Sequence, residues 1–262
     1  KSHSTNEHVK PVKMNHVVKN PNETAVEKFG ANGFDHKLDT DALQKAINSN
    51  NSITLRSGGI YIIDEPLIAS HSLKITTDGE KSATILQRSK KSALIFDNKP
   101  IAHSYVTNAI SSKQNYIILS STKGIKPGFL LHIKSSTLWY WDDRGYLTKG
   151  ELHKVTKVDG KKVFLDGPIV ESYDAGKSES VIAYVYQNEP LILNNIKFTH
   201  SKPMNTIMLY VNYTVDSQFN RVTVKNSKRT GILLNTTFNT KVSKANIDLG
   251  TTKDIQTGYG IQ

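Results

Sequence analysis

The pattern of apolar and polar residues changes once, early in the chain. Ala42, Leu43, Ala46 and Ile47 fall at helical spacing and predict a short amphipathic helix that begins near Asp39 or Thr40. From residue 52 onward, short apolar runs alternate with turn residues, which predicts strands near residues 53–55, 60–63, 67, 73–76 and 84–86. One early helix before many short strands predicts an all-β solenoid, sandwich or barrel.

The last third of the chain repeats itself. Two lines of matching apolar triplets carry the repeat, at residues 196–198, 222–224 and 247–249, and at 207–209, 231–233 and 260–262. A spacing of about 25 residues is expected when each turn of a solenoid holds three short strands. Asparagine recurs around these strands, at positions 194, 195, 220, 226 and 246, where it suits the left-handed backbone of coil corners. The repeat reaches Gln262 with no capping element, so we expect a fragment of a longer protein or an open end that a partner covers.

Residues 101–187 interrupt this pattern. Val155–Val158 and Lys162–Leu165 flank Asp159-Gly160, which predicts a hairpin. Residues 116–119 and 123–133 predict another small β unit with a hairpin at Pro127-Gly128. The predicted organisation is a polar leader or linker (1–24), a cap with the first coils (25–100), an inserted β module (101–187) and further coils (188–262).

Three segments near the start of the chain resemble a known superfamily. They are FGANG at 29–33, DTDALQKAI at 39–47, and ITLRSGGIYIIDEPLIASHSLKITTDGEKSATI at 53–85. Their order and spacing resemble the N-terminal part of the pectate lyase-like superfamily, and the inserted module is similar to inserts in phage tail and bacterial surface proteins. The resemblance implies a right-handed parallel β-helix whose N-terminal end is capped by the helix, and a carbohydrate-active class of protein. The sequence departs from the family where Gly33-Phe34-Asp35 replaces the usual Gly-Asp-Gly.

Composition and charge narrow the class of partner. Lys and Arg exceed Asp and Glu by +11, which favours a polyanion such as an anionic polysaccharide or a teichoic-acid-like polymer. No nucleic-acid-binding signature is present, and no apolar run is long enough for a membrane helix, so neither nucleic acid nor a membrane is an expected partner. The chain has no cysteine, which excludes thiol chemistry. We expect a secreted, cell-surface or virion location.

The richest cluster of candidate residues lies in the predicted module. It is the run Trp139, Tyr140, Trp141, Asp142, Asp143 and Arg144. Aromatic rings stack on sugars, Arg144 suits an anionic group, and the two carboxylates could act as acid and base. The alternative is that the aromatic residues seal the module against the solenoid while Arg144 pairs with a neighbouring aspartate.

A second set of candidates lies on the coils, where the resemblance implies that a polymer runs along one face. His200 is a catalytic candidate, and Tyr213, Arg221 and Arg229 are candidates for substrate binding. Structural alternatives stand beside them: a charge at a turn is commonly solvated, and His200 could be a surface or stacking residue. Ca²⁺ stays open as a cofactor, because lyases of this fold commonly use it. No metal ligands are assigned, because the aspartates at 35, 39 and 41 suit the start of a helix.

These features favour a polysaccharide depolymerase, either a lyase or a glycoside hydrolase, acting on an anionic cell-surface polymer. The alternative is a non-catalytic β-helix that binds glycan or builds a tail spike or adhesin. An alginate-type epimerase would need a constellation of Asp, His and Tyr that the sequence does not assemble. A homotrimer is an open alternative, since trimers are common among tail spikes.

Overall fold

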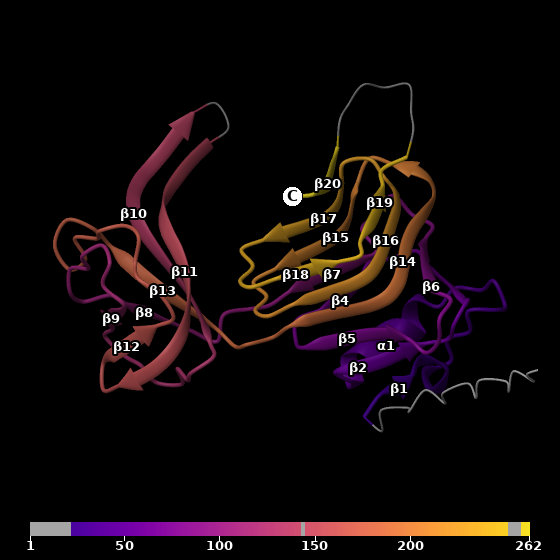
Figure 1. Cartoon of the computed structure of the whole chain (residues 1–262), viewed down its shortest axis with the longest axis horizontal. Helices are drawn as coiled ribbons and strands as arrows, with labels where there is room; N and C mark the ends of the chain where they lie inside the picture. Colours follow the sequence, from indigo (N-terminus) through magenta and orange to yellow (C-terminus); the bar gives the residue numbers. More distant parts are fainter. Residues whose placement is uncertain (1–21, 143–144, 251–257) are drawn as a thin grey trace, which may run out of the picture.

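The chain forms a stack of parallel coils and, beside it, a separate antiparallel sheet (Figure 1). The structure is a computed structural model that describes residues 22–142, 145–250 and 258–262, without the side chains of residues 140–146. No helix in the described ranges is long and apolar enough to cross a membrane.

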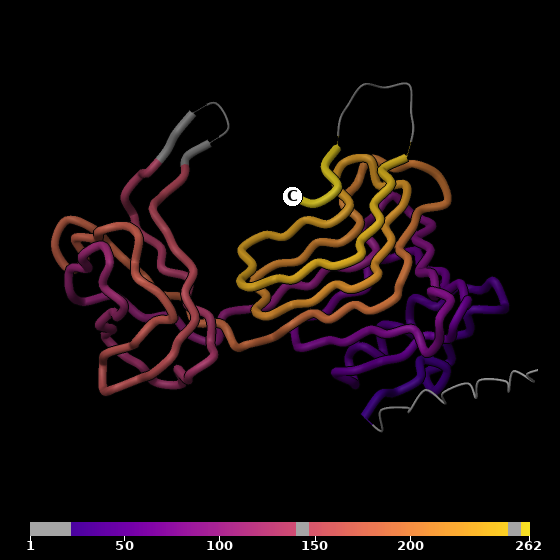
Figure 2. The backbone as a smooth tube through the Cα atoms, in the orientation of Figure 1, coloured from indigo at the N-terminus to yellow at the C-terminus, as the bar shows by residue number. Residues whose placement is uncertain are grey.

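Parallel pairing defines the coils. Before the interruption the coils contain β1 (Thr24–Ala25), η1 (Val26–Phe29), α1 (Thr40–Ser49), β2 (Ser52–Leu55), β3 (Ile60–Ile63), β4 (Leu67–Ala69), β5 (Leu73–Thr77), β6 (Ala83–Gln87) and β7 (Leu94–Asp97). After it they contain β14 (Leu191–Met204), β15 (Ile207–Asn212), β16 (Gln218–Ser227), β17 (Thr230–Asn235), β18 (Lys241–Ser243), β19 (Asn246–Asp248) and β20 (Tyr259–Ile261). One sheet runs β1-β2-β5-β14-β16-β18 and another runs β20-β17-β15-β7-β4. The backbone trace in Figure 2 shows the resulting stack, and the predicted parallel β-helix is confirmed.

Alternating side chains fill the interior of the coils. Ile75, Leu193 and Phe219 are in register on successive coils and are completely buried. Each buried side chain of this kind stabilises the fold by roughly 1.5–3 kcal/mol. A thin core of stacked rows explains how a chain with only 37% hydrophobic residues can fold.

The coil corners depend on left-handed residues. Short loops join β2 to β3 and β5 to β6, whereas β14 and β16 turn the same corner at single residues, Asn195 (φ 58°) and Arg221 (φ 55°). The Asn195 side chain accepts a hydrogen bond from Ser82 Oγ (2.7 Å) and donates to the carbonyls of Gly79 (2.8 Å) and Glu80 (3.1 Å). It therefore ties its own corner to the loop below it.

The predicted helix is present and closes the N-terminal end of the coils. Leu43, Ala46 and Ile47 are buried against the first coil. The helix begins where expected, with Asp39 at the N-cap position, but no side chain caps it: the Asp39 carboxylate instead accepts from the backbone N–H groups of Asn32 (2.8 Å) and Ile62 (3.2 Å). Ahead of the helix, the residues from Val26 to Phe29 form the 3-10 helix η1 and not an extended strand.

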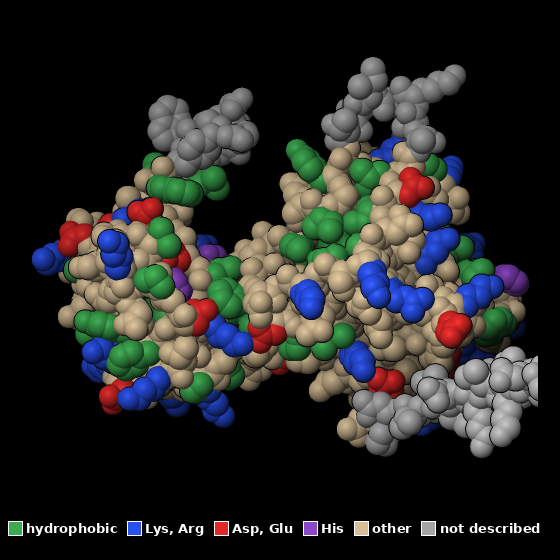
Figure 3. Space-filling model, viewed as in Figure 1, with side chains coloured by type: hydrophobic (Ala, Val, Ile, Leu, Met, Phe, Trp, Pro, Cys, Tyr) green, Lys and Arg blue, Asp and Glu red, His purple; other side chains and the backbone are tan. Residues whose placement is uncertain are grey.

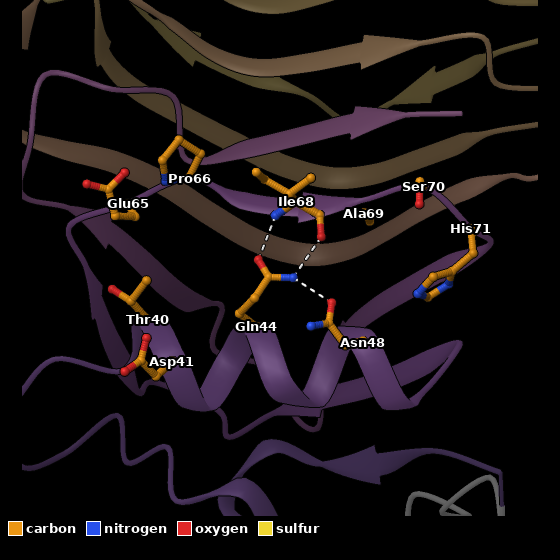
Figure 4. A pocket seen from close by; sticks show the side chains of 10 residues that line it. All are labelled: Thr40, Asp41, Gln44, Asn48, Glu65, Pro66, Ile68, Ala69, Ser70 and His71. Atoms are coloured by element: carbon orange, nitrogen blue, oxygen red, sulfur yellow. Dashed lines mark hydrogen bonds between the residues drawn. The ribbon is translucent and has the colours of Figure 1, made fainter. Parts of the chain in front are cut away.

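The helix also protects the edge strand β4. The Gln44 side chain donates to the carbonyl of Ile68 and accepts from its N–H, both at 2.8 Å, so it replaces a neighbouring strand (Figure 4). A pocket of about 500 Å³ lies here, lined by Gln44, Asn48, Glu65, Ile68 and His71 among others. His71 Nε2 lies 3.0 Å from the Ile47 carbonyl. The polar residues that line the pocket therefore hold the capping helix against the first coils.

The repeat is real, but its register differs from the prediction in two places. Ile196 pairs with Val222 as expected, whereas Ile247 pairs with Val224 and Ile207 pairs with Thr230. The coil step is 26 residues between Asn194 and Asn220 and 23 residues between Asn220 and Ser243. The triplets were matched by residue type, whereas the structure matches the positions that point inward.

The antiparallel sheet is built from the middle of the chain, and we call it the module. Its strands are β8 (Ala102–Tyr105), β9 (Tyr116–Ile118), β10 (Leu130–Asp142), β11 (Gly145–Asp159), β12 (Lys162–Leu165) and β13 (Val181–Tyr186), in the order β8-β13-β10-β11-β12-β9. The hairpin at Asp159-Gly160 is confirmed, with Gly160 at φ 56°. The hairpin expected at Pro127-Gly128 is wrong, because β9 pairs with β12. The predicted domain boundaries themselves stay a prediction.

The module leaves and re-enters the coils at one place. Asn98 Nδ2 donates to the Gln187 carbonyl, and β14 then pairs with β5 and β6, which precede the module in sequence. The module has a core of its own, which includes Ile133, Val163 and Val185.

Candidate glycan-binding surface

The two faces of the module sheet differ in character. Leu131 and Ile133 of β10 point into the module core, whereas His132 and Lys134 point to the opposite face. Tyr184 of β13 is directly opposite His132 and therefore shares that outer face. Its ring lies 6.0 Å from the ring of His103 and 5.8 Å from Lys134 Nζ. The outer face thus combines aromatic rings with a cation.

The base of this outer face packs on the coils. The rings of Tyr186 and Tyr213 stack at 4.2 Å with an interplanar angle of 9°, and Leu130 and Val215 are buried beside them. Next to this contact, Lys154 Nζ lies 2.6 Å from Asp216. Burial by itself would raise the pKa of Asp216, but hydrogen bonds from Lys154, Asn239 and Asn188 outweigh it and lower that pKa. These contacts fix one end of the outer face against the coils.

His132 lies between the coil contact and the open part of the face. Its ring is 5.7 Å from that of Tyr213, and its Nδ1 is buried without a partner among the described residues. Burial, followed by repulsion from Lys134, lowers the pKa of His132 to about 4. The imidazole is therefore neutral at pH 7, and Lys134 supplies the positive charge there.

The coils contribute a polar strip beside the same contact. Asn212 Nδ2 donates to Asp97 (3.0 Å) and Asn235 Nδ2 donates to Asn212 (3.0 Å), so side chains from β7, β15 and β17 form a ladder. Tyr213 follows directly on Asn212, and its N–H donates to the Asn235 carbonyl. The ends of β15 and β17 point toward the module (Figure 1). Amide and carboxylate groups of this kind suit the donors and acceptors of sugar hydroxyls.

A hairpin of β10 and β11 rises beside the coils, and a broad hollow separates the two (Figure 3). Trp139 is 67% exposed, and Leu138 and Leu147 are also exposed on this hairpin. Apolar side chains are visible on the hairpin and on the coil surface across the hollow. The alternative that Trp139 seals the module against the coils is therefore wrong. The side chains of the other predicted residues in this run, Tyr140, Trp141, Asp142, Asp143 and Arg144, lie outside the described residues.

The structure separates three of the four coil candidates, Arg221, Arg229 and His200, from the outer face. Tyr213 reaches it, as described above. Arg221 is at the coil corner, where its Nη2 lies 3.4 Å from the Glu80 carbonyl. Arg229 is exposed in the turn before β17, at the opposite end of that strand from Asn235.

His200 is inside the coils and is not a surface residue. It is 1% exposed, its Nδ1 lies 3.1 Å from the Gln87 carbonyl, and burial lowers its pKa. All four site assignments on the coils stay predictions.

One further carboxylate, Glu151, holds the module together. Glu151 accepts from His153, from the N–H groups of Val170 and Glu171, and from the Tyr173 hydroxyl. Burial alone would raise the pKa of Glu151, but these bonds lower it to about 2. Within the described ranges, no cluster of His, Asp and Glu residues has the geometry to hold a metal ion.

The fold defines the chain as a parallel β-helix that carries an antiparallel module, and solved structures share this arrangement. The tailspike protein gp49 from Pseudomonas phage LKA1 matches with a TM-score of 0.74 and 21% identity, over 91% of this chain and 44% of that one. The tailspike gp61 of Pseudomonas phage phi297 matches with a TM-score of 0.70 and 16% identity, over 92% of this chain and 44% of that one. The Gp54 tailspike of Acinetobacter baumannii bacteriophage AP22 was solved with an A. baumannii capsular saccharide. It matches with a TM-score of 0.55 and 13% identity, over 89% of this chain and 44% of that one.

This chain therefore spans less than half the length of each of these tailspikes, and its β-helix resembles those of phage tail proteins. No protein-family model matches the chain, and no curated protein matches it.

Sequence reasoning missed most of the outer face. His103, His132, Lys134 and Tyr184 come from three strands that are neighbours only in the folded sheet. A partial signal was present, because His132 and Lys134 alternate with apolar residues in β10. Alternation marks an outward face, but it does not indicate which strands lie beside it.

Proposed function

We propose that this chain is the glycan-binding β-helix portion of a virion-borne tailspike, and that it binds a bacterial surface polysaccharide. The observation that supports it most is the outer face of the module, where Lys134 lies over the Tyr184 ring and Tyr184 packs against the Tyr186–Tyr213 contact, which adjoins the Asp97–Asn212–Asn235 ladder of the coils. Rings stack on the C–H faces of sugars, and the polar ladder meets their hydroxyls. The likeness to tailspikes, one of them solved with a capsular saccharide, supports the same class of ligand.

The test is binding of the whole chain to a panel of purified capsular and O-antigen polysaccharides, measured by biolayer interferometry. Tyr184→Ala removes the half-buried ring that lies between His103 and Lys134 on the outer face, and we expect affinity to fall about three- to tenfold. Tyr116→Ala is the matched control, because Tyr116 also lies beneath a lysine, Lys162, at 3.9 Å, but on the edge strand β9. A wild-type protein that binds no glycan, or equal losses in both variants, would contradict the proposal.

Cleavage of the bound polymer is the second candidate function. It is favoured by the position of Asp142 in the chain, where β10 ends on the hairpin that borders the hollow (Figure 3). Asp142 and Asp143 remain the proposed acid and base, since a histidine with a pKa near 4, such as His132, is a weak base at pH 7. New reducing ends separate hydrolysis from simple binding, and absorbance of new double bonds detects a lyase. Activity that survives in both Asp142→Ala and Asp143→Ala would remove these residues from the mechanism.

A further inference from the structure

Lys134 lacks the carboxylate partner that two neighbouring lysines of the module, Lys149 and Lys154, have among the described residues. Lys154 pairs with Asp216 at 2.6 Å, and Lys149 pairs with Glu179 at 2.7 Å. Lys134 is exposed and has no carboxylate partner among the described residues, and its Nζ lies over the Tyr184 ring. Tyr184 is half-buried, and the exposed ammonium group above its ring is free to pair with an incoming anion.

The surroundings make this position selective for an anionic group attached to a sugar. His132 is neutral at pH 7, so the positive charge on this part of the face is the Lys134 ammonium group, whose Nζ lies 5.8 Å from the centre of the Tyr184 ring. His132 and Lys134 are two positions apart on β10, roughly 7 Å in an extended strand, which is comparable to one sugar ring with its substituent. The exposed His103 ring, at 6.0 Å from the Tyr184 ring, extends the apolar surface away from the charge.

We propose that Lys134 and Tyr184 form a subsite for a carboxylate-bearing sugar, such as a uronate. The sugar ring stacks on Tyr184, and its carboxylate pairs with the Lys134 ammonium group. The subsite rests on the proposed glycan-binding function and adds the chemical class of one sugar in the polymer. The net charge of +11 attracts polyanions in general, and the subsite assigns one of these positive charges to a specific contact with the ligand.

The experiment compares an acidic polymer with its neutral counterpart. The probes are polygalacturonate, alginate and polysialic acid, each also in carboxyl-reduced form, together with poly(glycerol phosphate). Lys134→Gln is expected to weaken binding of the acidic polymer about fivefold and to leave binding of its reduced form unchanged. Lys134→Arg is expected to restore binding, and Lys162→Gln, which removes the lysine above Tyr116, is expected to bind like the wild type. Melting curves of all variants check that they fold.

Each result has a distinct meaning. Failure of the wild-type protein to bind any glycan overturns the proposed function, and the subsite with it. Wild-type binding that Lys134→Gln leaves unchanged overturns the subsite alone. Equal losses on the acidic and reduced polymers, or a loss confined to poly(glycerol phosphate), overturn the assignment to a carboxylate.

Discussion

The corner at Asn195 allows a sharp test of how the coils are held together. Asn195→Ala removes three side-chain hydrogen bonds, to Ser82, Gly79 and Glu80, at a residue that is 5% exposed. At about 1 kcal/mol each, their loss costs roughly 3 kcal/mol. Alanine tolerates the left-handed backbone less well than asparagine, which adds about 1 kcal/mol. We expect the free energy of unfolding to fall by about 4 kcal/mol.

A second variant separates the two contributions. Asn195→Gly loses the same hydrogen bonds but adopts a φ of 58° without strain, so we expect a loss of about 3 kcal/mol. Lys244→Ala is the control, because Lys244 occupies the equivalent corner at φ 53°, is exposed and makes no side-chain hydrogen bond with the described residues. It should change stability by less than about 0.5 kcal/mol.

The assay is urea unfolding followed by far-UV circular dichroism. Tryptophan fluorescence is unsuitable, because Trp139 and Trp141 are both in the module and report little on the coils. The reasoning is refuted if Asn195→Ala is as mild as Lys244→Ala, or if the alanine and glycine variants are equally stable.

Three further predictions concern the cap, the coil contact and pH. Gln44→Leu exposes the backbone of edge strand β4 and should cost about 1–2 kcal/mol and promote self-association, seen by light scattering, whereas Lys45→Ala should do neither. Tyr213→Ala removes the stack on Tyr186 and should destabilise the contact by about 2 kcal/mol, so that calorimetry resolves separate transitions for module and coils. Glu151 has a lowered pKa, so its stabilisation is complete above pH 4.5 and is lost as pH falls toward 2. Urea unfolding at pH 5 and pH 3 should show a smaller difference for Glu151→Gln than for the wild type, and an equal difference would contradict this.

Local patterns predicted the elements of the coils well. The helix at residues 40–49 and the strand at 60–63 follow from the spacing of apolar residues within a few positions of the chain. The tertiary structure did not override these local preferences. Asp39 shows the limit, because a buried carboxylate accepts from whichever N–H groups the fold places near it, and the N–H of Ile62 comes from a strand more than 20 residues away.

The candidate surface was less accessible to sequence reasoning. Its parts meet only after β10 pairs with β13 and the module packs on the coils, so Tyr184 and His132 lie 52 positions apart in the chain yet are directly opposite in the sheet. The Trp139 run was conspicuous because its residues are consecutive. Tyr213 was found because it falls on a coil, but its ring contacts the module, which the repeat could not reveal.

The close approach of the module's two ends has a consequence for the order of folding. Asn98 and Gln187 are hydrogen-bonded across 89 positions, and closing a flexible loop of that length costs about 4 kcal/mol in chain entropy. If the module folds first, Ile101 and Val185 already hold its ends together, and β14 meets β5 across only a short segment. Early module formation thus turns a long-range pairing into a nearly local one, and growth of the later coils is expected to be limited by the folding rate of the module.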